Sequence, residues 1–272
     1  MSATPEKEHL FAEERQDRIL ALLQQEGKLL IPALCEAFSV SPATIRNDLN
    51  DLERRGLLQR THGGAIAISK TGFEPNFLQK QVKNSRQKEA IAAAAASYVE
   101  DGDTLVIDTG TTALAFAAAL SGKHDLTVLT NDIKVAALLD EQTENTVILT
   151  GGTIRRNFFC TLGPLVTQSL RQFRADKCFL ATNGISAAAG LTTPDLGQAE
   201  IKRLMAEISS QVFVLCDSSK VGVDAFVTVL PLNKVDTVIT DAGIDPEEQT
   251  ALQACGTELV VVQTNSMGTK GA

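Results

Sequence analysis

The first quarter of the chain carries apolar residues at the period of an α-helix. Ile45, Leu49 and Leu52 follow one another at i, i+4 and i+7, so they share one face of a helix, and we expect that face to be buried. Ser41 is a favourable N-cap residue, and Gly56 is of the type that ends helices. The pattern therefore predicts a helix between these two residues.

The opposite face of this predicted helix is polar. At about 100° per residue it presents small, amide and cationic side chains. These are Ala43, Asn47, Asn50 and Arg54, with Arg46 beside them. Such a mixture of donors and acceptors suits the DNA major groove, where the base edges present both kinds of group. The pattern equally allows an ordinary amphipathic helix with a solvated polar face.

Two further helical stripes precede this segment. Their apolar residues are Ile19, Leu22 and Leu23 in the first stripe and Ile31, Leu34, Cys35 and Phe38 in the second. We expect the first helix to end at Gly27 and the second to begin near Pro32. Only Ser39 and Val40 then separate the second helix from the next N-cap. Two short helices joined by so tight a turn predict a helix-turn-helix, whose second helix enters the DNA groove.

A hairpin is predicted directly after these helices. The runs Leu57–Thr61 and Ala65–Ile68 can pair across His62-Gly63-Gly64. This wing makes the domain a winged helix-turn-helix over residues 13–69. We expect Arg60 and His62 in the wing to contact DNA phosphate or the minor groove.

Residues 70–84 have weak periodicity, which predicts a linker. Phe73 and Phe77 could hold this linker against one domain. The pattern changes after it. Residues 85–263 alternate short apolar runs with helical stretches, which predicts a largely parallel α/β sheet covered on both faces. The predicted strands are Thr104–Asp108, Leu126–Thr130, Thr146–Thr150, Lys177–Thr182, Val212–Asp217, Thr237–Thr240 and Glu258–Gln263. The predicted helices are Gln87–Val99, Ala113–Leu120, Ile133–Leu139, Leu165–Phe173, Gln198–Ser209 and Pro246–Ala254.

Several of these strands end in polar, glycine-rich sequence, and ligands of open α/β sheets bind beyond the carboxyl ends of the strands. The best candidate for an anion site is Gly110-Thr111-Thr112, where backbone N–H groups meet a helix N-terminus. Lys220 could supply the matching cation, while Asp108 and Asp217 could accept hydrogen bonds from sugar hydroxyls. The alternatives are that Gly151-Gly152 is only a turn, and that Asp217 and Lys220 are only a helix cap and a surface lysine.

Composition narrows the class of protein. The net charge is −8, which argues against a chain that coats nucleic acid over its whole surface. With no tryptophan and one tyrosine, stacking on bases is not expected to be the main binding mode. The five cysteines are widely spaced and form no CxxC pair, so we expect buried free thiols rather than disulfides or zinc ligands. Without a signal peptide or a membrane-length apolar run, we expect a cytoplasmic protein.

Specific motifs in both halves resemble the DeoR family of bacterial transcriptional regulators. The first half carries ERQDRILALLQQEGKL and VSPATIRNDLNDLERRGLLQRTHGGA, and the second carries IDTGTT, LTND, LTGGTIRR, ADKCFLATNGI and LCDSSKVG. The resemblance spans nearly the whole chain. In this family the residue after Arg46 is usually a second arginine, and here it is Asn47.

The resemblance implies a second domain with a fold like ribose-5-phosphate isomerase and glucosamine-6-phosphate deaminase. It also implies a phosphorylated sugar or related metabolite as effector. We expect DNA contacts from Ser41, Ala43, Thr44, Arg46, Asn47, Asn50, Arg54, Arg60 and His62. By the family pattern the effector pocket would be lined by Asp108, Gly110, Thr111, Thr112, Asn131, Gly151, Gly152, Arg155, Asp217 and Lys220.

The expected function is that of a sequence-specific repressor of a carbohydrate-utilisation operon, acting as a homodimer or homotetramer on operator DNA. The alternative is a sugar-phosphate isomerase with an appended DNA-binding domain. Isomerisation needs a general base at a carbon-bound proton and a group that stabilises the enediolate. Asp108, Asp217, Glu200 and Lys220 could nominally serve, but a domain joined to a winged helix is more simply interpreted as a sensor. No catalytic residue, metal or cofactor is therefore expected.

Overall fold

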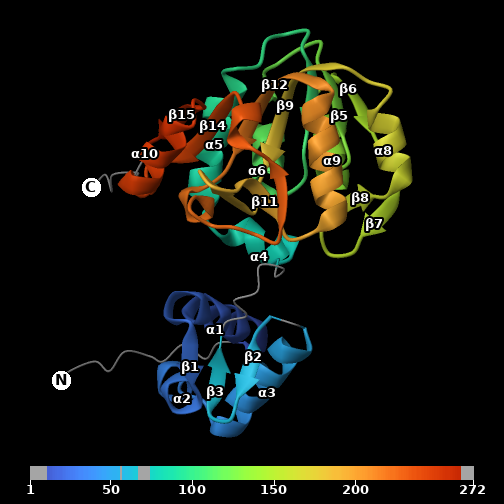
Figure 1. Cartoon of the computed structure of the whole chain (residues 1–272). Helices are drawn as coiled ribbons and strands as arrows, with labels where there is room; N and C mark the ends of the chain where they lie inside the picture. Colours follow the sequence, from blue (N-terminus) through green and yellow to red (C-terminus); the bar gives the residue numbers. More distant parts are fainter. Residues whose placement is uncertain (1–10, 56, 67–73, 265–272) are drawn as a thin grey trace, which may run out of the picture. The chain divides into compact units, whose positions relative to one another are not determined.

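The computed structural model describes residues 11–55, 57–66 and 74–264, which fall into two compact units that divide between Pro75 and Asn76 (Figure 1). The first unit contains three helices and a three-stranded antiparallel sheet in the order β1-β3-β2 among its described residues. Its elements are α1 (Ala12–Glu26), β1 (Lys28–Leu30), α2 (Ile31–Phe38), α3 (Pro42–Arg54), β2 (Gln59–Thr61) and β3 (Gly64–Ile66).

The three helices of the first unit pack as their apolar stripes predict. Ile19, Leu34, Ile45, Leu49 and Leu52 are at most 1% exposed and form one core cluster. The Ser41 hydroxyl accepts a hydrogen bond from the Thr44 backbone N–H at 3.1 Å, which confirms the predicted N-cap. The predicted helix end at Gly56 lies outside the described residues, and α3 itself ends at Arg54.

The wing differs in detail from the prediction. Thr61 pairs with Gly64, so the turn consists of His62 and Gly63 alone. The predicted second run extends to residues 67 and 68, which lie outside the described residues. The sequence did not predict β1, whose three residues pair with β3. A Cβ atom at Gly64 would lie 1.9 Å from the Leu29 carbonyl oxygen, so this close pairing requires glycine.

The second unit is built on a seven-stranded sheet in which every pair of neighbours is parallel. The strand order is β15-β14-β12-β9-β4-β5-β6. The bounds are β4 (Thr104–Ile107), β5 (Thr127–Thr130), β6 (Thr146–Leu149), β9 (Ala175–Ala181), β12 (Ser209–Leu215), β14 (Thr237–Asp241) and β15 (Glu258–Val262). The predicted parallel sheet is confirmed, and the strand order reverses between β4 and β9, which is where ligands bind in folds of this kind.

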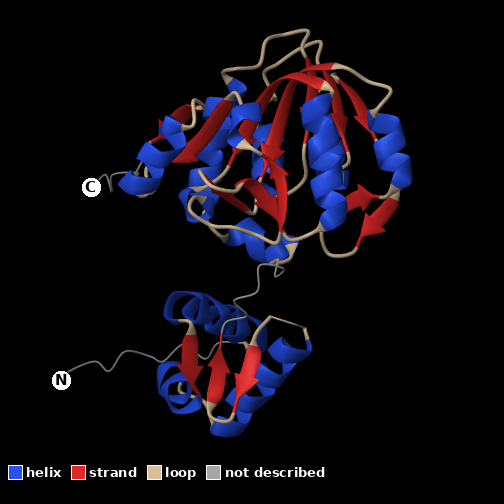
Figure 2. Cartoon of the chain, viewed as in Figure 1, coloured by secondary structure: helices blue, strands red, loops and turns tan. Residues whose placement is uncertain are grey.

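Helices cover both faces of this sheet (Figure 2). Their bounds are α5 (Ser85–Ala96), α6 (Thr111–Ala118), α7 (Ile133–Gln142), α8 (Pro164–Leu170), α9 (Leu196–Glu207) and α10 (Pro246–Ala254). One core cluster joins α5, α6 and α7 to the sheet around Phe116 and Phe179, and another joins α8, α9 and α10 around Leu180 and Leu204. Ala92 and Ala95 of the alanine-rich α5 are buried in the first of these clusters.

Two small antiparallel sheets were not predicted. They are the hairpin β7 (Thr153–Arg155) with β8 (Cys160–Leu162), and β10 (Gly184–Ser186), β11 (Gly190–Thr193) and β13 (Val227–Leu230) in that order. Their strands are too short for alternation to stand out in the sequence. Within the described residues, no helix is long and apolar enough to span a membrane.

Part of the predicted linker is a helix of the second unit, so the linker prediction is too long. Residues Phe77–Val82 form α4, which begins with a capping box between Asn76 and Gln79. Phe77 is 1% exposed and packs edge-to-face on Phe159, with ring centroids 5.3 Å apart. Its backbone N–H donates to the Asn157 carbonyl at 3.2 Å, so α4 is held against the turn between β7 and β8. Phe73, which was also predicted to hold the linker against one domain, lies outside the described residues.

Candidate functional site

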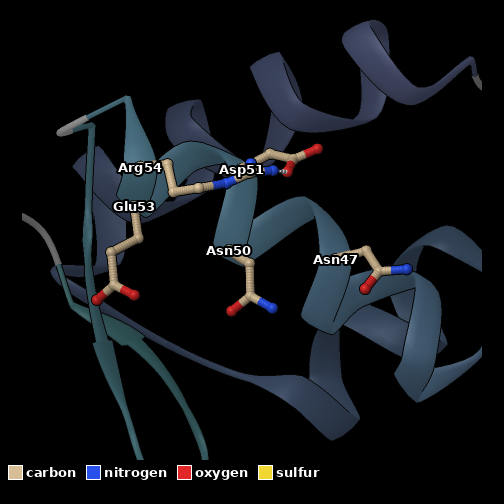
Figure 3. A pocket seen from close by; sticks show the side chains of 5 residues that line it. All are labelled: Asn47, Asn50, Asp51, Glu53 and Arg54. Carbon is tan, nitrogen blue, oxygen red and sulfur yellow. Dashed lines mark hydrogen bonds and ion pairs between the residues drawn. The ribbon is translucent and has the colours of Figure 1, made fainter.

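The outward face of α3 carries the amide and cationic side chains predicted for it (Figure 3). Asn47, Asn50 and Arg54 are exposed, and with Asp51 and Glu53 they line a shallow hollow on this face. Arg54 forms an ion pair with Asp51, one turn earlier. The other predicted residues on this surface, Ser41, Ala43, Arg46 and His62, are also exposed, whereas Thr44 and Arg60 are half-buried. The surface has the donors and acceptors that base edges need.

The inward side of α3 carries a buried ion pair that the sequence did not reveal. Asp48 is 4% exposed, and its carboxylate accepts from the Arg15 guanidinium of α1 at 2.6 and 3.1 Å. Gln16 donates to the same carboxylate at 3.4 Å and accepts from Arg55 at 3.0 Å. This bidentate contact joins two helices across the core and fixes how α3 is presented.

The wing is tied to the same helix by two hydrogen bonds. The Arg60 guanidinium donates to the Asn50 side-chain oxygen, and the Arg60 backbone N–H donates to the Glu53 carboxylate at 2.9 Å. Asn50 and Arg60 were predicted as separate DNA contacts. Because they are bonded to each other, a change at Arg60 also affects the orientation of Asn50.

In the second unit, Asp108 lies directly after β4, at the reversal of the strand order, and is 0% exposed. Its Oδ2 accepts from the Ala181 backbone N–H at 2.9 Å and from the Lys202 ammonium group of α9. The Lys202 ammonium also donates to the Ala181 carbonyl at 3.0 Å. Asp108 was predicted here, whereas Lys202 was missed. The sequence carried one signal for Lys202. It lies four residues after Gln198, so the two side chains share one face of a helix, and that face also carries apolar residues.

The polar ends of β4 and β5 meet as predicted. Asp132 follows Asn131 after β5, and its Oδ2 accepts from the Gly110 backbone N–H at 3.0 Å, which brings the start of α6 to the end of β5. Asn131 is 0% exposed and donates to the Thr161 carbonyl at 2.8 Å. Burial raises the pKa of Asp132, and the nearby Asp108 carboxylate adds to that rise, while backbone N–H donors oppose it. Thr111 and Thr112 form the first turn of α6, the former half-buried and the latter buried.

Gly151 and Gly152 lie beside this cluster and lead into β7, which ends at Arg155. A Cβ at Gly152 would come within 2.6 Å of the Leu162 carbonyl oxygen, so Gly152 serves close packing of the hairpin, whereas Gly151 is exposed. Arg155 forms an ion pair with Asp195, the N-cap of α9, at 3.3 Å. The turn interpretation therefore accounts for Gly152, and Arg155 links the hairpin to the helix that carries Lys202.

Asp217 and Lys220 form a second cluster at the end of β12. Asp217 is 3% exposed, and its Oδ1 accepts from the Asn84 side chain at 2.7 Å. Burial is the main cause that lowers the pKa of Lys88 to about 8; the Asp217 carboxylate opposes the shift, and Lys220, Lys80 and Lys83 add to it. Burial and Lys220 also lower the pKa of Lys83. The ammonium groups of Lys83, Lys88 and Lys220 thus lie close enough to influence one another, and such a concentration of positive charge favours an anion.

The predicted ligand residues therefore fall into two neighbouring groups. One group lies near Lys202 and contains Asp108, Gly110, Asn131 and Arg155. The other group lies at the end of β12 and contains Asp217 and Lys220, together with Asn84, Lys83 and Lys88. Lys83, which follows α4, and Lys88, in α5, were not predicted, because both precede the first strand of the parallel sheet and their place beside the end of β12 depends on the tertiary fold. Within the described residues no group of three or more His, Cys, Asp or Glu side chains is placed to hold a metal ion.

Comparisons with known proteins agree with this two-part construction. Residues 15–71 match the DeoR-like helix-turn-helix domain, and residues 83–242 match the DeoR C terminal sensor domain. The chain belongs to the DeoR family. The resemblance inferred from the motifs is thereby confirmed.

Curated relatives match along nearly their whole lengths. The chain is 34% identical to the HTH-type transcriptional regulator GolR of Listeria innocua, covering 93% of this chain and 100% of the relative. It is 35% identical to the glycerol-3-phosphate regulon repressor of Escherichia coli K12, covering 84% of this chain and 90% of the relative. These relatives are named as transcriptional regulators, and this DeoR-family chain is a DNA-binding regulator with a sensor domain rather than an enzyme.

Solved structures align with parts of the chain at low identity. The chain aligns with ribose 5-phosphate isomerase A from Methanocaldococcus jannaschii over 51% of this chain and 55% of that one, at 17% identity and a TM-score of 0.38. It aligns with the translation initiation factor eIF-2B of Pyrococcus horikoshii OT3 over 84% of this chain and 82% of that one, at 13% identity and a TM-score of 0.42.

Proposed function

We propose that this DeoR-family regulator represses a carbohydrate-utilisation operon and that a phosphorylated sugar or polyol controls its DNA affinity. The observation that carries the proposal is the group of ammonium ions around Asp217. Lys83 and Lys88 interact there with the Asp217 carboxylate and with the Lys220 ammonium group, and this concentration of positive charge favours a phosphate. The name of the Escherichia coli relative, a glycerol-3-phosphate regulon repressor, supports the same class of control.

The effector lies, in this proposal, along the carboxyl edge of the sheet. The residues that we propose to line its site are Asp108, Gly110, Thr111, Thr112, Asn131, Gly151, Gly152, Arg155, Asp217 and Lys220, with Lys83 and Lys88 added from the structure. Thr111 lies in the first turn of α6, where backbone N–H groups favour an anion. A ligand acts as a switch only if it binds the DNA-bound and released states unequally, and a coupling of roughly 1–3 kcal/mol is typical.

The DNA-binding surface consists, in the same proposal, of the exposed face of α3 and the wing. Its residues are Ser41, Ala43, Thr44, Arg46, Asn47, Asn50, Arg54, Arg60 and His62. Helix-turn-helix proteins usually read two half-sites about 34 Å apart or a multiple of that distance. We therefore propose a homodimer or homotetramer, assembled through the sensor domain.

The test is operator affinity as a function of sugar-phosphate concentration for wild type, Thr111→Asp and Lys220→Ala. Thr111→Asp places a carboxylate where the phosphate is proposed to bind, and Lys220→Ala removes a charge-assisted hydrogen bond worth roughly 1.5–3 kcal/mol. Both variants should bind operator normally and need more than tenfold higher effector concentration for the same response. Lys234→Ala is the matched control, because Lys234 is exposed in a separate 3₁₀ turn.

The two variants have different possible outcomes. Thr111→Asp should be the more severe because of like-charge repulsion, unless its carboxylate imitates the ligand and holds the effector-bound state permanently. Constitutive release from operator would reveal that second case. A wild-type response in both variants would mean that the effector binds elsewhere.

A further inference from the structure

The helix α4 is the first element of the second unit along the chain, so the first unit is attached to the second through it. It has six residues, Phe77–Val82. Isolated helices shorter than roughly 12 residues are marginally stable in water, because the first turn is costly to form. The order and the position of α4 therefore depend on the contacts that the rest of the second unit makes with its two ends.

The N-terminal end of α4 is bound to the turn between β7 and β8. Besides the ring contact and the backbone hydrogen bond that Phe77 makes with this turn, the Lys134 ammonium lies 5.0 Å from the Phe77 ring centroid and 4.5 Å from that of Phe159. The Phe159 carbonyl accepts from the Ile133 backbone N–H at 2.8 Å. Ile133 and Lys134 begin α7, which follows the proposed ligand residue Asn131 at the end of β5. The group near Lys202 is thus connected to this end of α4.

The C-terminal end of α4 is bound to the group at the end of β12. The Lys88 ammonium of α5 is buried and donates to the carbonyls of Lys80 and Lys83, at 2.5 Å in each case. The last carbonyls of a helix have no partner within it, and a cation stabilises them. The next residue, Asn84, donates to Asp217 at 2.7 Å. This end of α4 is therefore held by the group of side chains proposed to bind the phosphate.

One ammonium group serves both α4 and the proposed phosphate site. An ammonium has three N–H donors, and the two carbonyls of α4 take two of them, which leaves one for a further acceptor such as a phosphate. A bound phosphate attracts the Lys88 ammonium. This attraction competes with the carbonyls of α4 for the same buried cation, so it alters how the C-terminal end of α4 is held.

We propose that α4 transmits effector occupancy to the DNA-binding unit, with Phe77 and Lys88 as the residues that position its two ends. The inference rests on the proposed sugar-phosphate control and deepens it. A phosphorylated sugar that contacts both ligand groups acts on both ends of α4 at once. Because the polypeptide runs from the first unit into α4, a change in the position or order of α4 changes the attachment of that unit and shifts the balance between the DNA-bound and released states.

The first experiment measures whether the ligand changes α4 in the wild-type full chain. A panel of pentose, hexose, pentitol and hexitol phosphates is screened for the compound that changes operator affinity most, and that compound is the probe in all later measurements. Hydrogen exchange followed by mass spectrometry then compares residues 76–84 with and without the probe. We expect the exchange rate of these amides to change by roughly fivefold or more, which is the lower end of typical coupling factors.

A variant at the N-terminal end tests the coupling itself. Phe77→Ala removes the ring that contacts Phe159, which releases this end of α4 without changing a residue proposed to bind the effector or DNA. The probe should change operator affinity by roughly 5- to 150-fold in the wild type and by less than about twofold in Phe77→Ala. Calorimetry should give a probe dissociation constant within about threefold of the wild-type value, because the lysines are unchanged. A residue with only a structural role would weaken both affinities and leave the coupling factor unchanged.

Two further variants complete the test. Leu78→Ala is the matched control, because Leu78 is the next residue of α4 and its side chain is 64% exposed, so the wild-type coupling factor should remain. Asn76→Ala is a milder change that removes the capping box of α4, and it should lower the factor partway. Thermal unfolding shows whether each variant is folded, and Asn76→Ala replaces Phe77→Ala if the latter is not.

The outcomes separate this inference from the proposed function. Unchanged exchange in residues 76–84 when the probe binds would overturn the role of α4, while sugar-phosphate control stands. A wild-type coupling factor in a folded Phe77→Ala or, where that variant does not fold, in Asn76→Ala would overturn it as well. If no compound of the panel changes the operator affinity of the wild type, the proposed sugar-phosphate control fails, and transmission through α4 fails with it.

Discussion

Asn47 lies exposed on the outward face of α3 (Figure 3). An asparagine side chain can bond bidentately to adenine N6 and N7 in the major groove. Asn47→Ala should therefore cost roughly 1–3 kcal/mol of binding free energy on the true operator and relax preference at one base pair. The measurement is affinity for the operator, for single-base variants and for random DNA. An equal loss of affinity on all three DNAs would mean that Asn47 contacts the DNA backbone or stabilises the fold.

Asp48, the next residue, is expected to act through the fold instead. Asp48→Ala removes the carboxylate that accepts from the buried Arg15 guanidinium, and breaking a buried ion pair in this way typically costs about 3–5 kcal/mol. We expect reduced hydrogen-exchange protection of α1 and α3 in the full chain and weaker binding to every DNA sequence. The double variant Arg15→Met with Asp48→Leu removes both charges and should recover most of the protection. If the double variant is as damaged as the single one, the ion pair itself is needed.

At the scale of elements, the wing and α3 behave as one unit, since Arg60 is bonded to Asn50 and Glu53. If the Arg60 side chain also reaches a phosphate, Arg60→Ala should lower the slope of log affinity against log salt by about 0.9. The loss of its bond to Asn50 should in addition lower discrimination at the base read by α3. An unchanged slope with altered discrimination would make Arg60 a residue that only positions Asn50. Glu53→Gln keeps an acceptor for the Arg60 backbone and serves as the control.

At the scale of the whole molecule, the lysine cluster predicts a pH response in which stability and ligand affinity change in opposite directions. Burial lowers the pKa of Lys88 to about 8 in the folded chain, whereas an unfolded lysine has a pKa of about 10.4. Between these values the unfolded chain binds more protons, so the contribution of Lys88 to stability rises with pH. A bound phosphate favours the charged ammonium, so effector affinity should fall above about pH 8.

Calorimetric titration between pH 7 and pH 9.5, with the phosphorylated sugar that proves active in the operator-affinity test, measures this fall, which approaches tenfold per pH unit for one linked proton. Lys88→Arg keeps a charge that does not titrate in this range and should flatten the profile. Asp217, Lys80, Lys83 and Lys220 remain in both proteins, so their titration is common to both profiles. Identical profiles would show that Lys88 does not face the ligand.

Local pattern was sufficient for most elements of this chain. Helix periodicity and capping located α1, α2 and α3, and apolar runs located all seven strands of the parallel sheet, because both signals depend on neighbouring residues. Motif spacing was likewise sufficient for the DeoR family. The sequence also located the ends of strands at which Asp108, Asn131 and Asp217 lie, since ligands of parallel sheets gather there.

Tertiary structure alone decided which of these residues meet. Lys202 reaches Asp108 across 94 residues of chain, and Asn84 reaches Asp217 across 133, so no local pattern marks either pair. The three-residue strand β1 is stabilised by its pairing with β3 rather than by its own propensity. Asp48 looks like one more polar residue of an amphipathic helix, and only the packing of α1 buries it against Arg15. In each case the partner is supplied by the strand order or by helix packing, which depend on the free energy of the whole domain rather than on neighbouring residues.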